Sequence, residues 1–156
     1  MLAHSTGGLV ARLYVHKQME VLPDGHPIIK HLMLLGTPNN GVPCADSMGS
    51  NDAFRDQMQT AKELMPEEMA HFNRYVTQRK GTQFSALVGN SVPILCATPE
   101  WNDGFVSVES AKYGLEDVTL TSAKHPDMVN TETFNNYVKP HVIVGPRGTY
   151  PFGTKP

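Results

Sequence analysis

The residues that could do chemistry begin with a serine near the start of the chain. Ser5 stands in the sequence Ala3-His4-Ser5-Thr6-Gly7, after a short apolar lead and before a helical pattern. A serine on a sharp turn between a strand and a helix needs small residues two places before it and two places after it. Ala3 and Gly7 meet this requirement, with alanine where the commonest form of the motif has glycine. The sequence therefore predicts a nucleophile elbow at Ser5, although so short a pattern also arises by chance.

Two further residues could complete a catalytic relay with Ser5. A serine nucleophile needs a base that takes its proton and a carboxylate that orients the base. Asp103 comes after one predicted strand and His125 after the next, so both are expected in loops at one edge of a sheet. We therefore predict His125 as the base and Asp103 as the carboxylate. The alternatives are Glu109, Glu116 and Asp117 among the acids, and His4, His16, His26, His31, His71 and His141 among the histidines.

The predicted elbow also supplies part of an oxyanion hole. A helical pattern runs from Gly8 to about Glu20. The positive amino-terminal end of this helix would point at Ser5 and favour the negative oxygen that forms during acyl transfer. The backbone N–H of Thr6 would be one oxyanion donor.

The elements that position these residues predict an α/β protein. Compact apolar runs at 28–35, 83–88 and 118–121 are typical of buried strands, and helical patterns cover 8–20, 65–76 and 130–138. A loop through Pro93 and Pro99 is expected to lead to Asp103. The apolar lead before Ser5 has only four residues, too few for a central strand of ordinary length. We therefore expect a mostly parallel sheet flanked by helices, with amino-terminal strands missing from this chain.

Four blocks of sequence, in this order, resemble the serine lipases of the α/β-hydrolase fold, especially bacterial triacylglycerol lipases. The blocks are 4–9 (HSTGGL), 35–41 (LGTPNNG) continuing to 45–46 (AD), 102–106 (NDGFV), and His125 followed by Asp127. The resemblance implies that Ser5 is the nucleophile, His125 the general base and then acid, and Asp103 its orienting partner. It also implies a second oxyanion N–H from a loop after an earlier strand, which is missing from this chain.

The resemblance suggests how the chain is divided. Residues 1–144 are expected to form the carboxyl-terminal part of an α/β-hydrolase domain, and 145–156 a poorly ordered tail rich in glycine and proline. Within the domain, 42–82 form a helical insert where such lipases carry a lid over the acyl pocket. Half of the methionines lie in this insert, where they would either meet acyl chains or pack in the core: Met48, Met58, Met65 and Met69.

No cofactor is predicted, and calcium is the one metal that the resemblance raises. Some such lipases bind a structural calcium through an aspartate two residues after the histidine, where this chain has Asp127. Calcium needs six to eight oxygen ligands, and Gly81 stands where a partner aspartate is expected. Asp127 is therefore either a calcium candidate or a residue that starts the last helix. Cys44 and Cys96 could form a disulfide or be small apolar residues.

Composition narrows the possible partners. A net charge of −2 and a pI near 6.4 provide no basic surface for nucleic acid, and no apolar run approaches the length of a membrane helix. The expected partner is an ester or lipid substrate, and an exposed strand edge would favour self-association. The sequence thus predicts a carboxylic-ester hydrolase. The alternatives are an inactive truncated fragment that serves as an interaction module, and an acyltransferase or thioesterase that uses the same three residues.

Overall fold

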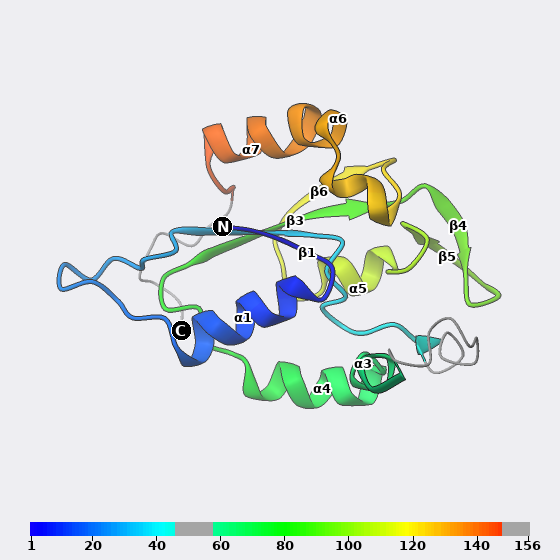
Figure 1. Ribbon diagram of the computed structural model, residues 1–156, viewed down its shortest axis with the longest axis horizontal. Helices are drawn as coiled ribbons and strands as arrows, with labels where there is room; N and C mark the ends of the chain where they lie inside the picture. The colour runs from blue at the N-terminus through cyan, green and yellow to red at the C-terminus, as the bar shows by residue number, and fades with distance from the viewer. Residues whose placement is uncertain (46–57, 148–156) are drawn as a thin grey trace.

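A parallel four-stranded sheet forms the centre of the protein. The structure, a computed structural model, describes residues 1–45 and 58–147. The strands are β1 (Leu2–His4), β2 (His31–Leu35), β3 (Gln83–Gly89) and β6 (Asp117–Thr121), arranged in the order β1-β2-β3-β6 with every pair parallel. Helices cover both faces of this sheet (Figure 1). The predicted fold class, a mostly parallel sheet flanked by helices, is therefore confirmed.

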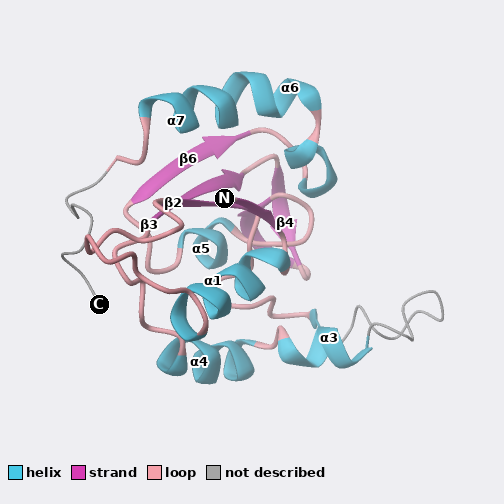
Figure 2. Ribbon diagram, turned by 60° about the vertical axis from the view of Figure 1, so that its left-hand side comes forward, coloured by secondary structure: helices cyan, strands magenta, loops and turns pink. Residues whose placement is uncertain are grey.

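The two faces of the sheet are covered by different helices. Helices α1 (Gly7–Lys17) and α4 (Pro66–Tyr75) lie on one side of the sheet, with α3 (Met58–Glu63) beside α4. On the other side lie α6 (Thr131–Thr133), the π-helical turn η3 (Phe134–Val138) and α7 (Lys139–Val144) (Figures 1 and 2). The described residues also form α5 (Val108–Lys112) and the short 3₁₀ helix η2 (His125–Val129). No helix in the described ranges is both long and apolar enough to cross a membrane.

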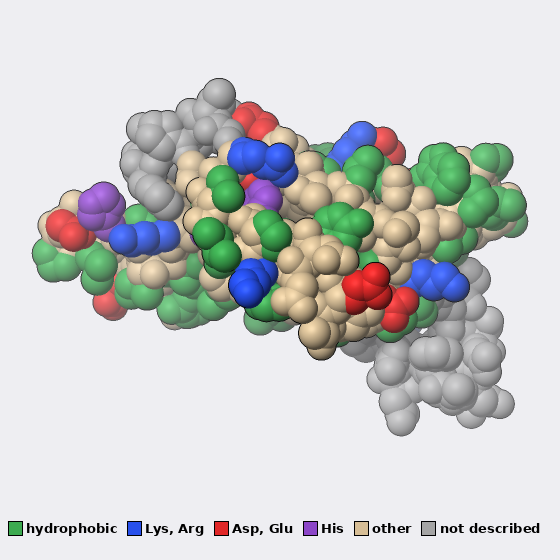
Figure 3. Space-filling model, turned by 90° about the horizontal axis from the view of Figure 1, so that it is seen from above, with side chains coloured by type: hydrophobic (Ala, Val, Ile, Leu, Met, Phe, Trp, Pro, Cys, Tyr) green, Lys and Arg blue, Asp and Glu red, His purple; other side chains and the backbone are tan. Residues whose placement is uncertain are grey.

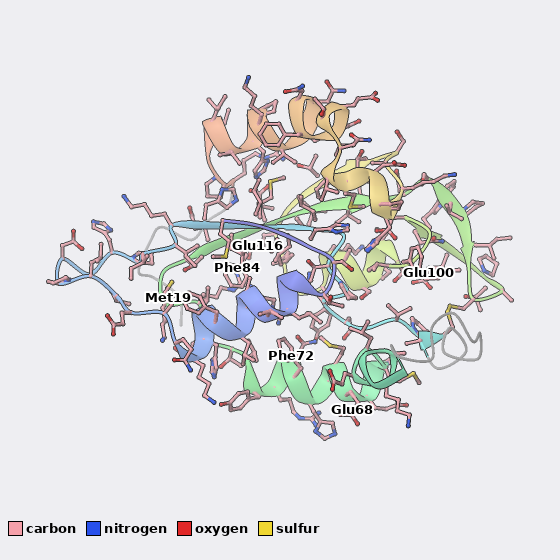
Figure 4. The ribbon with its side chains drawn as sticks, viewed as in Figure 1. Met19, Glu68, Phe72, Phe84, Glu100 and Glu116 are labelled. Carbon is pink, nitrogen blue, oxygen red and sulfur yellow. A yellow bond between two sulfur atoms is a disulfide. The ribbon has the colours of Figure 1, made fainter. Side chains whose placement is uncertain are left out.

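Strand β2 shows why its sequence reads as a continuous apolar run. Leu32 and Leu34 point to the face of α1 and pack in one cluster, whereas Met33 and Leu35 pack on the opposite face. All four side chains are almost fully buried, as expected for a parallel strand that is covered on both sides. Figure 4 shows Met19 and Phe84 on the side of α1, where Phe84 packs against the same cluster.

The segment expected to be a loop between β3 and Asp103 is instead a hairpin. Strands β4 (Val92–Leu95) and β5 (Thr98–Asn102) pair antiparallel. Pro93 and Pro99 argue against strands in a large sheet, but a two-stranded hairpin consists only of edge strands, where proline is tolerated. Cys96 and Ala97 form its turn with φ values of 53° and 63°. Positive φ at both central residues suits the twist of a two-residue hairpin.

Two other features differ from the sequence reading. Helical structure extends past Val138, where the sequence predicted the last helix to end. The π-helical turn η3 is followed directly by α7, and Pro140 lies in the first turn of α7, where proline is tolerated. Cys44 and Cys96 form a disulfide, which settles the pairing that the sequence left open. The division into a domain at 1–144, an insert at 42–82 and a tail stays a prediction, and residues 46–57 and 148–156 lie outside the described ranges.

Candidate active site

The predicted elbow is a sharp turn between β1 and α1. Ser5 has a φ of 54°, a left-handed conformation that is costly for a residue with a side chain. Its N–H donates to the carbonyl oxygen of Leu35 at 2.9 Å, and its carbonyl accepts from the N–H of Gly8 at 3.0 Å. A Cβ at Gly8 would overlap the side chain of Thr37. The small residue at position 8 therefore lets α1 start directly against the loop that follows β2.

The structure brings Ser5, His125 and Asp103 into one hydrogen-bonded chain. His125 Nε2 lies 2.9 Å from Ser5 Oγ, and His125 Nδ1 lies 2.7 Å from Asp103 Oδ2. Asp103 is 1% exposed and His125 is 9% exposed. With a proton on Nδ1 donated to the carboxylate, Nε2 is left as the acceptor for the serine O–H. This arrangement can withdraw a proton from Ser5 and stabilise the imidazolium that results.

The carboxylate of Asp103 is held by its own loop. The N–H groups of Phe105 and Val106 donate to Oδ1 at 2.9 and 2.7 Å, so that Oδ2 is left for His125. The N–H of His125 donates to the carbonyl oxygen of Asp103 at 2.8 Å, which joins the two loops through the backbone. Asn102 is fully buried and donates to the carbonyl oxygens of Val92 and Glu100.

Two glycines allow this close approach, and the sequence reading did not single them out as site residues. A Cβ at Gly36 would lie 2.9 Å from Asp103 Oδ2 and 3.1 Å from His125 Nδ1. A Cβ at Gly89 would lie 2.5 Å from the Cβ of Asp103. Both glycines stand at the carboxyl ends of predicted strands, and this position could have identified them from the sequence. A strand that ends beneath the reacting groups leaves no room for a side chain there.

His4 is a further residue that contacts the relay. Its Nε2 lies 2.9 Å from the carbonyl oxygen of His125, and the two rings are 4.7 Å apart between centroids. Burial lowers the pKa of His4, against the opposing effect of the hydrogen bond to that carbonyl. A neutral His4 with its proton on Nε2 donates to the carbonyl and connects the elbow to the histidine loop.

The predicted oxyanion donor lies beside the nucleophile. Thr6 is the amino-terminal cap of α1, and its N–H donates none of the backbone hydrogen bonds found within residues 1–45 and 58–147. Its N–H is thus available beside Ser5 at the positive end of a helix. The role of Thr6 as a donor to a reacting oxygen stays a prediction.

The calcium candidate has few suitable neighbours. Asp127 is exposed in the first turn of η2, and the described residues contain no group of three or more His, Cys, Asp or Glu side chains that could hold a metal ion. Helix α6 is capped by Asn130, whose side chain accepts from the N–H of Thr133, and not by Asp127. A calcium ion at Asp127 stays a prediction.

A second Asp–His pair lies at the other end of the sheet. His141, an alternative base in the sequence that lies beyond the predicted last helix, is buried in α7, with Nε2 2.9 Å from Asp117 Oδ2 at the start of β6. His31 lies 2.7 Å from the hydroxyl oxygen of Ser85, but Ser85 is 0% exposed. A substrate cannot reach this serine, so the second cluster is structural.

Comparison with known proteins gives a likeness of structure without a likeness of sequence. No protein-family model matches the chain, and no curated protein sequence does. The mature lipase BlEst2 of Bacillus licheniformis has a similar structure, with a TM-score of 0.67 and 19% identity over 89% of this chain. The propeptide form of BlEst2 has a TM-score of 0.61 and 16% identity over 86% of this chain. The phospholipase PlaB of Legionella pneumophila has a TM-score of 0.50 and 16% identity over 70% of this chain.

The likeness extends over only part of these enzymes. The chain spans 63% of the length of mature BlEst2, 34% of its propeptide form and 28% of PlaB. At 16–19% identity such matches establish the fold and leave the activity open. The chain therefore has a lipase/esterase-like α/β fold, matched over part of the length of these hydrolases.

Proposed function

We propose that the protein is a serine hydrolase of carboxylic esters that forms an acyl-enzyme on Ser5. The observation that carries the proposal is the continuous hydrogen-bonded chain from Asp103 through His125 to Ser5. The left-handed conformation of Ser5 supports it, because a strained nucleophile at the end of a strand presents its hydroxyl to a substrate.

Each proposed residue has one task in the reaction. Ser5 Oγ attacks the ester carbonyl carbon while His125 Nε2 takes the serine proton, and Asp103 stabilises the imidazolium. The N–H of Thr6 donates to the oxyanion of the tetrahedral intermediate. When the intermediate collapses, His125 gives the proton to the leaving alcohol and the acyl group stays on Ser5. A water molecule then attacks the acyl-enzyme by the same route and releases the acid.

Acyl transfer and thioester hydrolysis would use the same first step. An acyltransferase would replace the water by a second alcohol, and a thioesterase would release a thiol. Product analysis of the purified chain with a p-nitrophenyl ester, with and without an added alcohol, separates hydrolysis from transfer. An ester hydrolase gives the free acid as the main product in both mixtures.

The test of the proposal compares the chain with its Ser5→Ala variant. We expect hydrolysis of short and long p-nitrophenyl esters by the natural sequence and background rates for the variant. A fluorophosphonate probe, which reacts with an activated serine, should label the natural sequence and not the variant. Equal background from both chains, together with no labelling, would refute the proposal and favour the alternative of an inactive interaction module.

A second copy of the chain is a proposed partner at the open edge of the sheet. Strand β1 is at the end of the strand order, and Leu2 is 45% exposed there. Edge strands present unpaired backbone groups to other chains. We expect analytical ultracentrifugation to give a dimer that Leu2→Lys shifts toward the monomer. A chain that stays monomeric at all concentrations would refute the pairing.

A further inference from the structure

A half-buried arginine lies in the helix that begins beside the proposed nucleophile. Arg12 of α1 donates through Nη1 to Asn39 Oδ1 at 3.0 Å and through Nη2 to Asn73 Oδ1 at 2.8 Å. Its guanidinium also lies 5.1 Å from the centre of the Phe72 ring, and Figure 4 labels Phe72 between α1 and α4. Both hydrogen-bond acceptors are amide oxygens, so neither bond pairs the charge of Arg12 with a carboxylate.

The two asparagines are bonded to each other as well as to Arg12. Asn73 Nδ2 donates to the carbonyl oxygen of Asn39 at 2.8 Å, and Asn39 Nδ2 donates to the carbonyl oxygen of Ala111 in α5 at 2.8 Å. Asn39 is 1% exposed. Arg12, Asn39 and Asn73 are named here the Arg12 cluster. The cluster joins α1, α4 and α5 to the loop that follows β2.

The loop that contains Asn39 also forms part of the candidate active site. A Cβ at Gly36 would lie 2.9 Å from Asp103 Oδ2, and the side chain of Thr37 fills the space beside Gly8 in the first turn of α1. The N–H of Asn39 donates to the carbonyl oxygen of Thr37 at 2.8 Å. Because all these residues belong to one short loop, a shift of Asn39 moves the loop against both the Asp103 carboxylate and the start of α1.

The chemistry of Arg12 suits a role in geometry more than a role in stability. Burial, and next the charge of Arg79, lower the pKa of Arg12 from 12.5 to about 10. Arg12 therefore stays charged at neutral pH, and its desolvation opposes the gain from hydrogen bonds to neutral amides. The planar guanidinium, however, fixes two oxygens at once in a set geometry, whereas a lysine has one nitrogen.

We propose that Arg12 and Asn39 are positioning residues, which hold the loop of residues 36–41 against the elbow so that the Asp103–His125 pair meets Ser5 at the reacting distance. Arg12 acts through Asn39 and takes no part in proton transfer. The catalytic consequence rests on the function proposed above. The position of His125 is observed without turnover, so the positioning and the catalysis can fail separately.

The first test replaces the fork and keeps the charge. Arg12→Lys should lower kcat for p-nitrophenyl acetate about 5- to 50-fold with KM nearly unchanged, because a shift of about 1 Å costs on the order of 10²-fold in rate. Arg74→Lys is the matched control, since Arg74 is an exposed arginine of α4 whose Nη2 lies 2.7 Å from His71 Nδ1. Its kcat should equal that of the natural sequence. Equal losses in the two variants would overturn the proposal.

A double-mutant cycle tests whether Arg12 acts through Asn39. Asn39→Ala removes the acceptor for Arg12 and the donor to Ala111. If the two residues act as one unit, the double variant Arg12→Lys/Asn39→Ala should be no slower than Asn39→Ala alone. Losses that multiply would overturn the coupling. Asn73→Ala replaces a half-buried member of the cluster and supplies the same cycle for a chain that Asn39→Ala unfolds.

The hydrogen-bonded proton between His125 Nδ1 and Asp103 Oδ2 gives a readout that needs no turnover. Such a proton resonates at low field, at a position that depends on the nitrogen–oxygen distance. We expect the signal, assigned by its loss in His125→Gln, to shift in Arg12→Lys and to stay in place in Arg74→Lys. An unchanged signal and an unchanged kcat in Arg12→Lys, even with a lower urea midpoint, would overturn the proposal, because the cluster would then only stabilise the fold.

The second Asp–His pair serves as an internal reference for this signal. His141 Nε2 lies 2.9 Å from Asp117 Oδ2. Helix α7, which carries His141, lies across the sheet from α1, on the face of the molecule that Figure 3 shows. Its low-field signal should stay in place in Arg12→Lys, and equal shifts of both signals would overturn a local positioning role. If the His125 signal shifts as expected but no chain hydrolyses the ester, the positioning stands and the proposed catalysis fails.

Discussion

Substitution of Gly36 by alanine should disturb the hydrogen-bonded chain of Asp103, His125 and Ser5 without replacing any of these three residues. Gly36 directly follows β2 and has a φ of 54°. An added Cβ would lie 2.9 Å from Asp103 Oδ2, 3.1 Å from His125 Nδ1 and 2.8 Å from Met128 Sδ. The methionine can move away because its thioether is flexible. The carboxylate and the imidazole cannot, because they are hydrogen-bonded to each other at 2.7 Å.

The size of the effect follows from these distances. To reach ordinary van der Waals contact, the Asp–His pair must move by about half an ångström, and a shift of about 1 Å costs on the order of 10²-fold in rate. We expect kcat/KM to fall about 10- to 100-fold. Overpacking should lower the free energy of unfolding by about 1–3 kcal/mol, in addition to about 1–2 kcal/mol for a left-handed alanine.

Gly25→Ala is the matched control. Gly25 has a φ of 83°, and a Cβ there would meet no heavy atom within 4 Å. Gly25→Ala therefore has the same two backbone effects as Gly36→Ala, a left-handed alanine in the folded chain and a lower entropy of the unfolded chain. It lacks the close contact with Asp103 and His125. The assay is hydrolysis of a p-nitrophenyl ester together with urea unfolding of the three chains. If Gly36→Ala keeps the natural kcat/KM and unfolds like Gly25→Ala, the geometric reasoning is refuted.

Three other perturbations have expected outcomes. Asp103→Asn should lower kcat about 10³- to 10⁴-fold at neutral pH, because an amide cannot stabilise the imidazolium; a loss below tenfold in steady-state ester hydrolysis would contradict this. Burial lowers the pKa of His31 from 6.5 to about 4, so below about pH 6.5 the unfolded chain binds a proton that the folded chain does not. The free energy of unfolding should therefore decrease from pH 6.5 toward pH 4, by about 1–2 kcal/mol because this side chain is partly exposed to solvent. In the His31→Gln variant, the free energy of unfolding measured with urea should change less over the same pH range. Replacement of both Cys44 and Cys96 by serine should destabilise the fold by about 2–4 kcal/mol, since the bridge closes a loop with a sequence separation of 52; an unchanged urea midpoint would argue against this contribution.

The sequence was sufficient for those features that depend on local chemistry. The small residues around Ser5 predict its turn, because a strained serine cannot have large neighbours two places away. The apolar run that contains β2 predicts a strand covered on both faces. Parallel strands bring their carboxyl ends to one edge, and for this reason Asp103 and His125 could be placed near Ser5 without knowledge of the loops.

The features that were wrong or open depend on contacts distant in sequence. Pro93 and Pro99 led to the prediction of a loop where the structure has the hairpin of β4 and β5. Proline is excluded from central strands but tolerated in edge strands, and the sequence does not show which kind of strand a segment forms. Pairing of Cys44 with Cys96 requires the turn of that hairpin to meet the segment after β2. His141 lies beyond the helix predicted over 130–138, whereas the structure has it in α7 (Lys139–Val144). No local pattern indicates that a π-helical turn precedes Pro140.

The two Asp–His pairs of this fold show that residue types alone do not identify a catalytic site. His125 with Asp103 and His141 with Asp117 are both buried pairs, with nitrogen–oxygen distances of 2.7 and 2.9 Å. They differ in what lies on the open side of the imidazole. His125 Nε2 faces the hydroxyl of a half-buried, strained serine at the start of a helix. The serine near the second pair, Ser85, is fully buried and lies at hydrogen-bond distance from His31. A relay needs one ring nitrogen for the acid and the other for an accessible nucleophile, and of these two pairs His125 with Asp103 is the one that has a half-buried serine within hydrogen-bond distance.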